Sequence, residues 1–310
     1  MSHPLEQKWQ LVLRDFLANV PVRPLLVLIG PTASGKTALS VQIARKLLGG
    51  KQPVEIVNAD SRQLYRHLDI GTAKITETER SGVPHHLFSL QDPREPVSIA
   101  WYQKEAMRVI DDIHGRSALP LLVGGSMLYV SSIVDGLAPV ASDPSKRAAL
   151  EAEYDRDAGR TLHARLESLD PETAASIPVQ NKVYVVRAME MIEGTGKTKK
   201  EILEQKSSPY TSLILGIDPE DSVLRERIEK RIQAMFDVGW GEEVENLRRM
   251  GYTQDDPGMQ SVGYRQILEA IENGADPRST IPVITAKTWQ YARRHRTWWR
   301  GDERVKWLDE

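Results

Sequence analysis

The fold is decided by the stretch Leu25-Leu26-Val27-Leu28-Ile29-Gly30-Pro31-Thr32-Ala33-Ser34-Gly35-Lys36-Thr37. The apolar run that opens it is typical of a strand buried on both faces of a parallel sheet. The residues from Gly30 onward match the phosphate-binding pattern G-x-x-x-x-G-K-[ST], the P-loop. A helix is expected from Thr37 to Leu48, ended by Gly49-Gly50. This strand–loop–helix order predicts a site for the phosphates of a ligand.

Each residue type in the loop has a physical task. Backbone N–H groups near Gly30 and Gly35 must approach phosphate oxygens, and a Cβ would obstruct them. The positive end of the following helix points at the same oxygens. Lys36 adds a mobile positive charge, and the Thr37 hydroxyl can ligate Mg²⁺. The loop alone does not distinguish kinases, NTPases and other transferases.

Strand and helix signals alternate along the first part of the chain. Residues 53–57 and 119–123 have the apolar character of buried strands, and residues 97–113 show a helical pattern. Strands that alternate with helices indicate βαβ units, in which successive strands lie parallel. We therefore predict an α/β fold: a P-loop NTPase-like core with a mainly parallel sheet.

The pattern changes after residue 136. Residues 137–208 contain helical segments and almost no strand signal, and residues 213–217 then return as a strand. An insertion that interrupts the core explains this order. We expect the first part of the core at residues 1–136, an inserted all-helical domain at 137–208, and the rest of the core at 209–310.

The composition restricts the class of protein. The 310 residues include no cysteine, which excludes disulfides and thiolate metal sites and fits a reducing compartment. No apolar run approaches the roughly 20 residues of a membrane span, and the N-terminus shows no secretion signal. We expect a cytoplasmic monomer that does not enter membranes. The net charge of −2 argues against a uniformly basic nucleic-acid binder but leaves room for a local basic patch.

A carboxylate follows the second expected strand. The polar turn there reads Asp60-Ser61-Arg62-Gln63. Because the carboxyl ends of adjacent parallel strands line one crevice, Asp60 is expected to face the P-loop. It can serve there as a general base or as an indirect Mg²⁺ ligand, and the alternative is a helix cap.

The adjacent histidines His85 and His86 suggest a metal site at first sight. Adjacent positions rarely ligate one ion, and no other His or Cys is near them in sequence. We expect a packed loop here.

The third expected strand ends in Gly124-Gly125-Ser126. Two glycines at a strand end indicate close approach of the backbone to a ligand. Ser126 would lie at the same crevice and could donate a hydrogen bond to a phosphoryl or bridging oxygen. Capping of the next helix by Ser126 is equally consistent with the sequence, and both roles can hold together.

The segment from Lys287 to Arg300 is both basic and aromatic. It contains five Lys or Arg residues and no acid, and four of the seven tryptophans lie from Trp289 onward. Charges interleaved with rings suit single-stranded nucleic acid, whose phosphates meet the charges and whose unstacked bases meet the rings. The alternative is an amphipathic helix with aromatic side chains in the core and solvated arginines.

In order and spacing these segments resemble the tRNA dimethylallyltransferases, the bacterial-type tRNA isopentenyltransferases. The resemblance runs from about Leu25 to the end of the chain, and it is the shared order of the motifs that is specific. The matching motifs are Gly30–Thr37, Asp60–Tyr65, Asp69–Lys74, Pro84–His86, Gly124–Ser126, Arg187–Glu190, Val262–Arg265 and Thr297–Arg300.

The resemblance implies prenyl transfer to RNA. The dimethylallyl group of dimethylallyl diphosphate would move to N6 of the adenosine 3′-adjacent to the tRNA anticodon, and diphosphate would leave. The P-loop would then bind the donor's diphosphate rather than a nucleotide. The inserted domain would help to clamp the anticodon stem-loop, and Mg²⁺ would be the metal.

The resemblance also assigns roles to residues. Asp60 would take the N6 proton as a base, while Lys36, Ser126 and Mg²⁺ would stabilise the negative charge that develops on diphosphate. Arg227 and Arg231 are further candidates for phosphate contact. The residues expected to contact tRNA are Asp60, Ser61, Arg62, Gln63, Ser126, Tyr184, Arg187, Gly263, Tyr264, Arg265, Arg293 and Arg294.

Several positions depart from the family's usual residues. Ser126 replaces a threonine and keeps its hydroxyl. Val183 and Tyr184 stand where a Gln-Arg pair is common, Trp289 replaces a frequent arginine, and His295 a frequent glutamine. Stacking by Tyr184 and Trp289 can replace ion pairing there. The competing functions are a P-loop kinase for a small metabolite and a non-catalytic RNA binder.

Overall fold

The computed structural model describes residues 4–19, 21–48, 53–136, 143–204 and 207–308. The chain divides into two compact units, one formed by Met1–Val134 with Pro209–Glu310 and the other by Asp135–Ser208. The expected start of the insertion at residue 137 and the glycine pair Gly49-Gly50 lie outside the described residues.

The larger unit is built on a parallel sheet. The described residues form six strands in the order β3-β2-β4-β1-β5-β6, and every pair is parallel. The strands are β1 (Pro24–Ile29), β2 (Val54–Asn58), β3 (His85–His86), β4 (Leu119–Gly124), β5 (Thr211–Gly216) and β6 (Val305–Trp307). The α/β fold with a parallel sheet is thereby confirmed.

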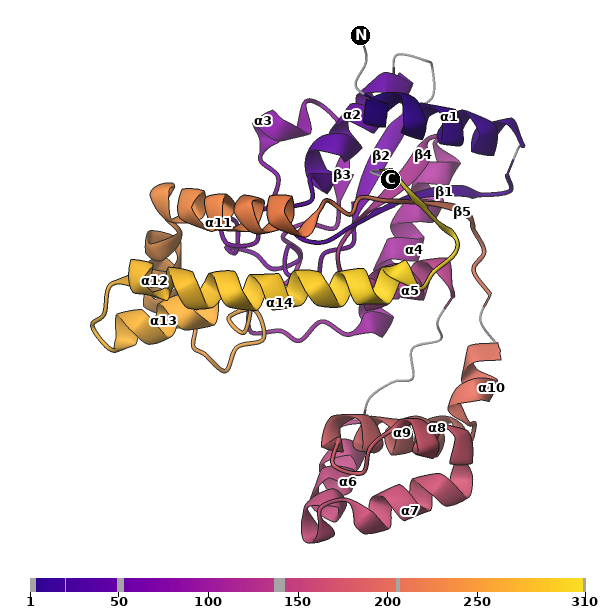
Figure 1. The fold of residues 1–310 in the computed structure, drawn as a ribbon, viewed down its shortest axis with the longest axis vertical. Coiled ribbons are helices and arrows are strands. Elements are labelled where there is room, and N and C mark those ends of the chain that lie inside the picture. Colours follow the sequence, from indigo (N-terminus) through magenta and orange to yellow (C-terminus); the bar gives the residue numbers. More distant parts are fainter. Residues whose placement is uncertain (1–3, 20, 49–52, 137–142, 205–206, 309–310) are drawn as a thin grey trace. The chain divides into compact units, whose positions relative to one another are not determined.

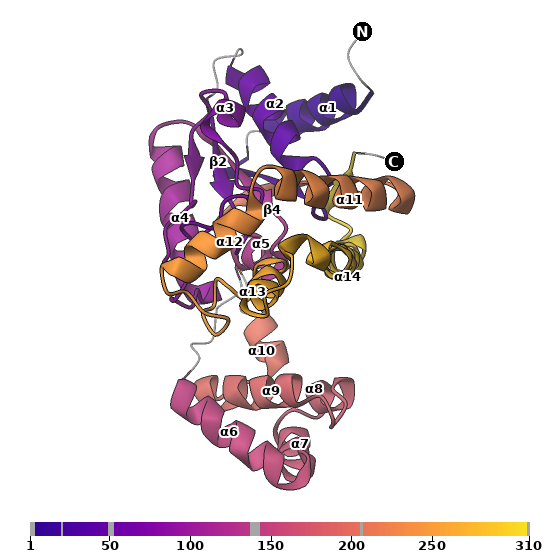
Figure 2. The ribbon, with the colours of Figure 1, turned by 90° about the vertical axis from the view of Figure 1, so that its left-hand side faces the viewer.

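Helices cover both faces of the sheet, which explains why its strands are apolar throughout. One face packs against α1 and α2 through side chains such as Trp9, Leu13 and Ile43. The other packs against α4 and α5 through Tyr102, Ile110 and others (Figures 1 and 2). These helices, with the short α3, are α1 (Pro4–Ala18), α2 (Lys36–Leu48), α3 (Glu77–Arg80), α4 (Ile99–Gly115) and α5 (Met127–Val134).

The C-terminal helices form a third apolar cluster of the larger unit. Leu224, Ile228, Ile232 and Phe236 make the buried stripe of α11, and Trp240 lies at the centre of the cluster. The elements are α11 (Asp221–Asp237), α12 (Trp240–Arg249), α13 (Tyr264–Glu272), the 3₁₀ turn Pro277–Thr280 and α14 (Ile281–Arg300). None of the helices among the described residues has the length and apolar character needed to cross a membrane.

The smaller unit is helical and has its own core. Leu150, Leu162, Leu166, Val185 and Met189 are buried in it. Its helices are α6 (Pro144–Asp157), α7 (Arg160–Leu169), α8 (Pro171–Ser176), α9 (Lys182–Thr195) and α10 (Lys199–Glu204).

Two strands differ from the sequence-based expectations. His85 and His86 form the edge strand β3 rather than a loop, because they pair with β2 and the ring of His86 bonds to Glu55 at 2.6 Å. The strand β6 was not expected, since three residues carry too little periodicity to be recognised.

Candidate active site

The carboxyl ends of three adjacent strands bring the predicted site residues together. Ile29 of β1 is in register with Gly124 of β4, and Asn58 of β2 is in register with Val123 of the same strand. The residues that follow these ends include Gly30, Asp60 and Ser126. They therefore lie at one edge of the sheet, where open parallel sheets bind ligands.

The P-loop is closely packed at its first residue. Gly30 has φ +155°, and a Cβ at this position would lie 2.5 Å from the carbonyl oxygen of Ile217. Lys36 Nζ donates hydrogen bonds to the carbonyl oxygens of Gly30 at 2.8 Å and Pro31 at 2.7 Å. The hydroxyl of Ser34 is buried and has no hydrogen-bond partner among the described residues. The loop thus encloses an ammonium group and leaves one polar atom unpaired.

The charge of Lys36 is costly in this setting. Burial lowers the pKa of its ammonium to about 7; the Asp60 carboxylate opposes this shift and the Arg231 guanidinium adds to it. A bound anion would restore the full charge, because an opposite charge favours the protonated form.

Two arginines of α11 lie beside the loop. Arg227 Nη1 approaches the carbonyl oxygen of Ser34 at 3.4 Å. Arg231 makes no hydrogen bond or ion pair among the described residues, and burial lowers the pKa of its guanidinium. A half-buried arginine without a partner beside a half-buried lysine is the electrostatic setting of an anion site.

Asp60 stabilises a turn and caps no helix. Its Oδ1 accepts from the backbone N–H of Arg62 at 2.8 Å, and its own N–H donates to Asn58 Oδ1 at 3.0 Å. The next α-helix along the described chain is α3, which begins only at Glu77. Its second oxygen, Oδ2, makes no hydrogen bond within the described residues, so it remains available to accept a proton.

Ser126 ties the ends of two strands together. Its Oγ accepts from the backbone N–H of Ser61 at 2.8 Å, and its N–H donates to the carbonyl of Ala59 at 3.0 Å. Its carbonyl accepts the first N–H bonds of α5, so its backbone begins the helix while its hydroxyl serves the Asp60 turn. The hydroxyl of Tyr291, on α14, reaches the same side chain.

The helix α14 has a buried face and an exposed basic face. His295, Arg296 and Trp299 are buried, and the Arg296 guanidinium bonds to Asp218, Asp221 and the carbonyl of Pro219. The core-packing interpretation of the C-terminal segment therefore holds for one face, and the other face carries the exposed Arg293 and Arg294.

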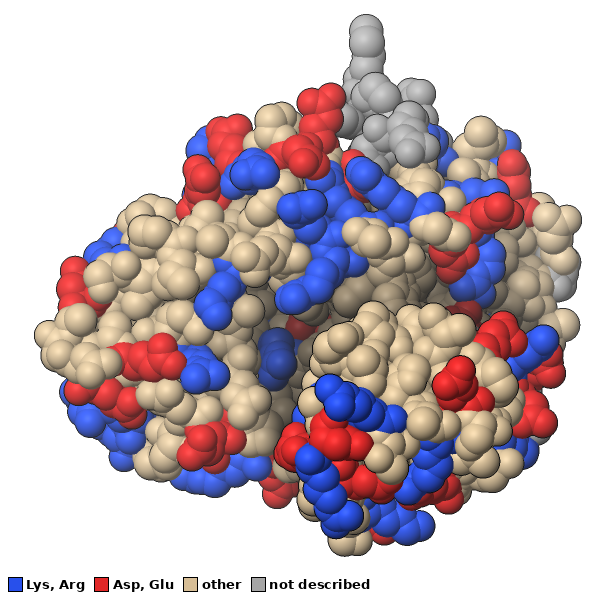
Figure 3. Space-filling model, turned by 60° about the horizontal axis from the view of Figure 1, so that its bottom comes forward, with Lys and Arg blue, Asp and Glu red and all other residues tan. Residues whose placement is uncertain are grey.

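Arg62, Arg293 and Arg294 are exposed arginines of the larger unit near the turn after β2 and on α14. They form no ion pair within the part of the chain that the structure describes. Arg62 does bond to the carbonyl of Pro257 at 3.1 Å, and Arg294 lies over the ring of Tyr291 at 5.7 Å. Figure 3 shows Lys and Arg side chains gathered over the middle of one face of the molecule.

Gln63, Gly263 and Tyr264 have structural roles. Gln63 donates to the carbonyls of Thr72 at 2.9 Å and Ala73 at 3.2 Å. Gly263 and Tyr264, which were expected to contact tRNA, are buried in the structure. The Tyr264 hydroxyl donates to Glu243 at 2.5 Å and accepts from the N–H of Gly71 at 3.0 Å. These contacts hold the loop at residues 69–74.

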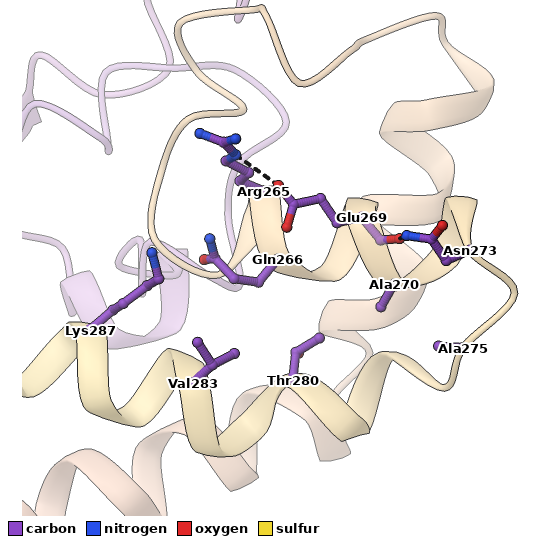
Figure 4. Close-up of a pocket in the computed structure, with 9 residues that line it drawn as sticks. All are labelled: Arg265, Gln266, Glu269, Ala270, Asn273, Ala275, Thr280, Val283 and Lys287. Carbon is purple, nitrogen blue, oxygen red and sulfur yellow. Dashed lines mark hydrogen bonds and ion pairs between the residues drawn. The ribbon is translucent and has the colours of Figure 1, made fainter.

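Arg265 is exposed and lies away from the strand ends. It pairs with Glu269 at 2.8 Å. Both side chains line a pocket of about 520 Å³ between α13 and α14, whose rim also carries Lys287 (Figure 4). This pocket shares no residue with the crevice at the P-loop.

In the helical unit, Tyr184 and Val183 are exposed, at 62% and 64%. Arg187 pairs with Glu190 of its own helix at 2.7 Å. The ring of Trp289, in the larger unit, is covered by the guanidinium of Arg225 at 4.1 Å. Of the two aromatic residues expected to stack on RNA, Tyr184 is thus the exposed one.

Two residues of the crevice were missed as site residues. Tyr291 and His295 lie one helical turn apart on α14, with ring centroids 4.4 Å apart. Their i, i+4 spacing indicates a shared helix face, but no sequence pattern indicates which strand ends that face meets.

Few side chains of the crevice could ligate a metal ion. The described residues contain no cluster of three or more His, Cys, Asp or Glu side chains that could hold a cation. The Thr37 hydroxyl makes no hydrogen bond among these residues and is a hard oxygen ligand of the kind that Mg²⁺ prefers. Thr37 fits a Mg²⁺ ion that takes its other ligands from ligand phosphates and water.

Comparison with known proteins decides the family. A family model described as IPP transferase matches residues 63–302. The chain belongs to the IPP transferase family. A tRNA dimethylallyltransferase of Mycobacterium marinum is 44% identical over 292 residues, which cover 93% of this chain and 92% of the relative. One of Thermomicrobium roseum is 39% identical over 290 residues, with 93% and 86% covered.

Solved structures of IPP transferases resemble this one. The tRNA isopentenylpyrophosphate transferase of Bacillus halodurans matches with a TM-score of 0.66 and 36% identity, over 92% of this chain and 89% of that one. A eukaryotic dimethylallyltransferase described as acting on tRNA has a TM-score of 0.78 at 24% identity and covers 92% of this chain and 74% of its own, a likeness of fold.

The lowered pKa of Lys36 makes anion binding pH-dependent. Above about pH 7 the free protein loses this proton, and a bound diphosphate must recapture it. Affinity for inorganic diphosphate in metal-free buffer should therefore fall as pH rises, by up to about tenfold per pH unit. Calorimetry at several pH values measures this slope. In Lys36→Arg, whose guanidinium stays protonated, only the titration of diphosphate itself should remain. Equal slopes for the two proteins would contradict the assignment.

Proposed function

We propose that this IPP transferase moves the dimethylallyl group of dimethylallyl diphosphate to N6 of the adenosine 3′-adjacent to a tRNA anticodon and releases diphosphate. The names of its relatives support the activity. One observation carries the chemistry: the carboxylate of Asp60, with an unused oxygen, lies within electrostatic reach of the P-loop Lys36. A base and an anion site in one crevice suit a reaction that removes a proton and expels diphosphate.

The adenosine that accepts the dimethylallyl group needs a base to remove its N6 proton. The lone pair of an exocyclic adenine amine is delocalised into the ring, so N6 is a poor nucleophile until its proton leaves. In the proposed step N6 bonds to C1 of the donor and its proton passes to Oδ2 of Asp60. The backbone N–H of Arg62 donates to Oδ1 of this carboxylate and orients it, and the bond from the Asp60 N–H to Asn58 Oδ1 holds the turn.

The departure of diphosphate from the donor requires a site that stabilises negative charge. As the C1–O bond breaks, its electron pair goes to the diphosphate oxygen, and negative charge grows there. Lys36, the loop N–H groups and the unpaired Arg231 are arranged to stabilise that charge. Ser126 positions the Asp60 turn through its bond to Ser61. We assign Mg²⁺ to the Thr37 hydroxyl, where it would neutralise part of the diphosphate charge.

The acceptor RNA requires a surface. A base inside a stacked loop cannot reach the crevice, so the adenosine must be flipped out. We assign phosphate contacts to Arg62, Arg293 and Arg294, since their guanidinium groups have no carboxylate partners among the described residues. Tyr184 is our candidate for base stacking in the helical unit. We also propose that the enzyme acts as a cytoplasmic monomer.

A transfer assay tests the function. The protein is incubated with Mg²⁺, radiolabelled dimethylallyl diphosphate and unmodified tRNA that carries an adenosine after the anticodon. Label should appear on that adenosine, and a tRNA with another base there is the control. Consumption of ATP with a small acceptor, and no label on tRNA, would instead identify a kinase.

Removal of the base should slow chemistry without weakening RNA binding. In Asp60→Asn the amide oxygen can still accept from the Arg62 N–H, so the turn is kept while the proton acceptor is lost. Turnover should fall at least about a hundredfold, with tRNA affinity nearly unchanged in a filter-binding assay. Normal turnover of this variant would reduce Asp60 to a turn residue.

Removal of the positive charges of Arg293 and Arg294 should weaken the binding of tRNA. The double variant Arg293→Gln and Arg294→Gln should weaken tRNA binding and lower the slope of log affinity against log salt by about 1.5. Arg108→Gln is the control, since Arg108 lies on α4 and already pairs with Glu105 and Asp112. An unchanged slope in the double variant would remove both residues from the RNA surface.

A further inference from the structure

His295 is a buried side chain beside the crevice, and its nearest polar neighbour among the described residues is the backbone of Gly125. His295 is only 2% exposed, and neither ring nitrogen makes a hydrogen bond of normal geometry among the described residues. A buried polar group that lacks a hydrogen bond destabilises the folded protein. A histidine is therefore unfavourable at this buried position unless a ligand forms a hydrogen bond with its ring.

The His295 ring lies near residues that we assign to the site of the diphosphate donor. A Cβ on Gly125, at the end of β4, would lie 2.7 Å from His295 Cε1, so only glycine lets the ring rest against this strand end. Tyr291, whose hydroxyl reaches Ser126, lies one helical turn away. The positive charge of Lys36 also acts on the ring. His295 thus lies against the end of β4 and within electrostatic reach of the lysine of the P-loop.

Its environment keeps the imidazole neutral. Burial, with the charge of Lys36, lowers the pKa of His295 to about 3. A neutral imidazole carries one N–H donor and one acceptor nitrogen. It can donate a hydrogen bond without adding a further repelling cation beside Lys36 and Arg231.

We propose that His295 is a donor-binding residue whose ring N–H donates a hydrogen bond to an oxygen of the diphosphate held by the P-loop. This inference deepens the proposed function and rests on it for the identity of the allylic donor. The hydrogen bond from the neutral ring would fix the position of the diphosphate, while Lys36 and Arg231 would compensate its negative charge. As negative charge grows on the leaving group, such a bond strengthens.

The test measures binding of inorganic diphosphate with Mg²⁺ by calorimetry. His295→Phe keeps a ring of similar shape but removes both nitrogens, and its affinity should fall about tenfold, the usual effect of one hydrogen bond to a charged group. His295→Gln restores an N–H donor and should bind within about threefold of the wild type. His114→Gln is the matched control, because His114 already bonds to the carbonyl of Pro24 at 3.0 Å.

A second readout follows the wild-type protein directly. Side-chain ¹⁵N NMR of the seven histidines, with His295 assigned through His295→Gln, should show one ring nitrogen of His295 shifting on addition of diphosphate. Wild-type affinity in a folded His295→Phe protein, or an unmoved ¹⁵N signal, would overturn the proposal and make His295 a packing residue. Diphosphate binding without prenyl transfer would refute the proposed function but leave the role of His295 in anion binding intact.

Discussion

The parallel pairing of β1 with β4, and of β4 with β2, is the constraint on which the site depends. Parallel strands present their carboxyl ends at the same edge, so three loops far apart in sequence converge there. These loops are the P-loop, the turn at Asp60 and the segment at Ser126 that begins α5. Two hydrogen bonds then lock the second to the third, from Ser61 to Ser126 and from Ser126 to Ala59. The crevice is rigid because it is part of the sheet's edge.

The electrostatics of this edge are unbalanced in the protein alone. Lys36 is half-buried against loop carbonyls, and Arg231 has no partner among the described residues. The Ser34 hydroxyl and the ring nitrogens of His295 make no hydrogen bond of normal geometry there. Each of these groups costs stability unless an anion or a hydrogen-bond acceptor arrives. Their common location means that one ligand, a diphosphate, could satisfy all of them. Asp60 partly offsets the positive charge and is the group left to accept a proton.

The helix α14 links this crevice to the outside of the molecule. Its Arg296 is anchored to the loop after β5 by bonds to Asp218, Asp221 and Pro219. That anchor places Tyr291 and His295 against the end of β4, while Arg293 and Arg294 point to solvent. One helix therefore contributes to the donor crevice on one face and presents basic groups on the other. Core packing accounts for the buried face of the helix, and the RNA contact that we propose falls to the exposed face.

Local sequence determined the P-loop, the buried strands beside it and the α/β class, because short apolar runs, glycines and a Lys-Thr pair encode these features within a few residues. It also indicated the helical insertion, through the loss of strand signals between residues 137 and 208. Only the tertiary structure decided that Asp60 caps no helix, that Tyr264 is buried against Glu243, and that His85 and His86 form an edge strand. The positions of Arg231, Tyr291 and His295 were likewise undetermined by sequence. Their roles depend on which helix faces pack beside the strand ends, and packing partners distant in the chain leave no periodic signal in it.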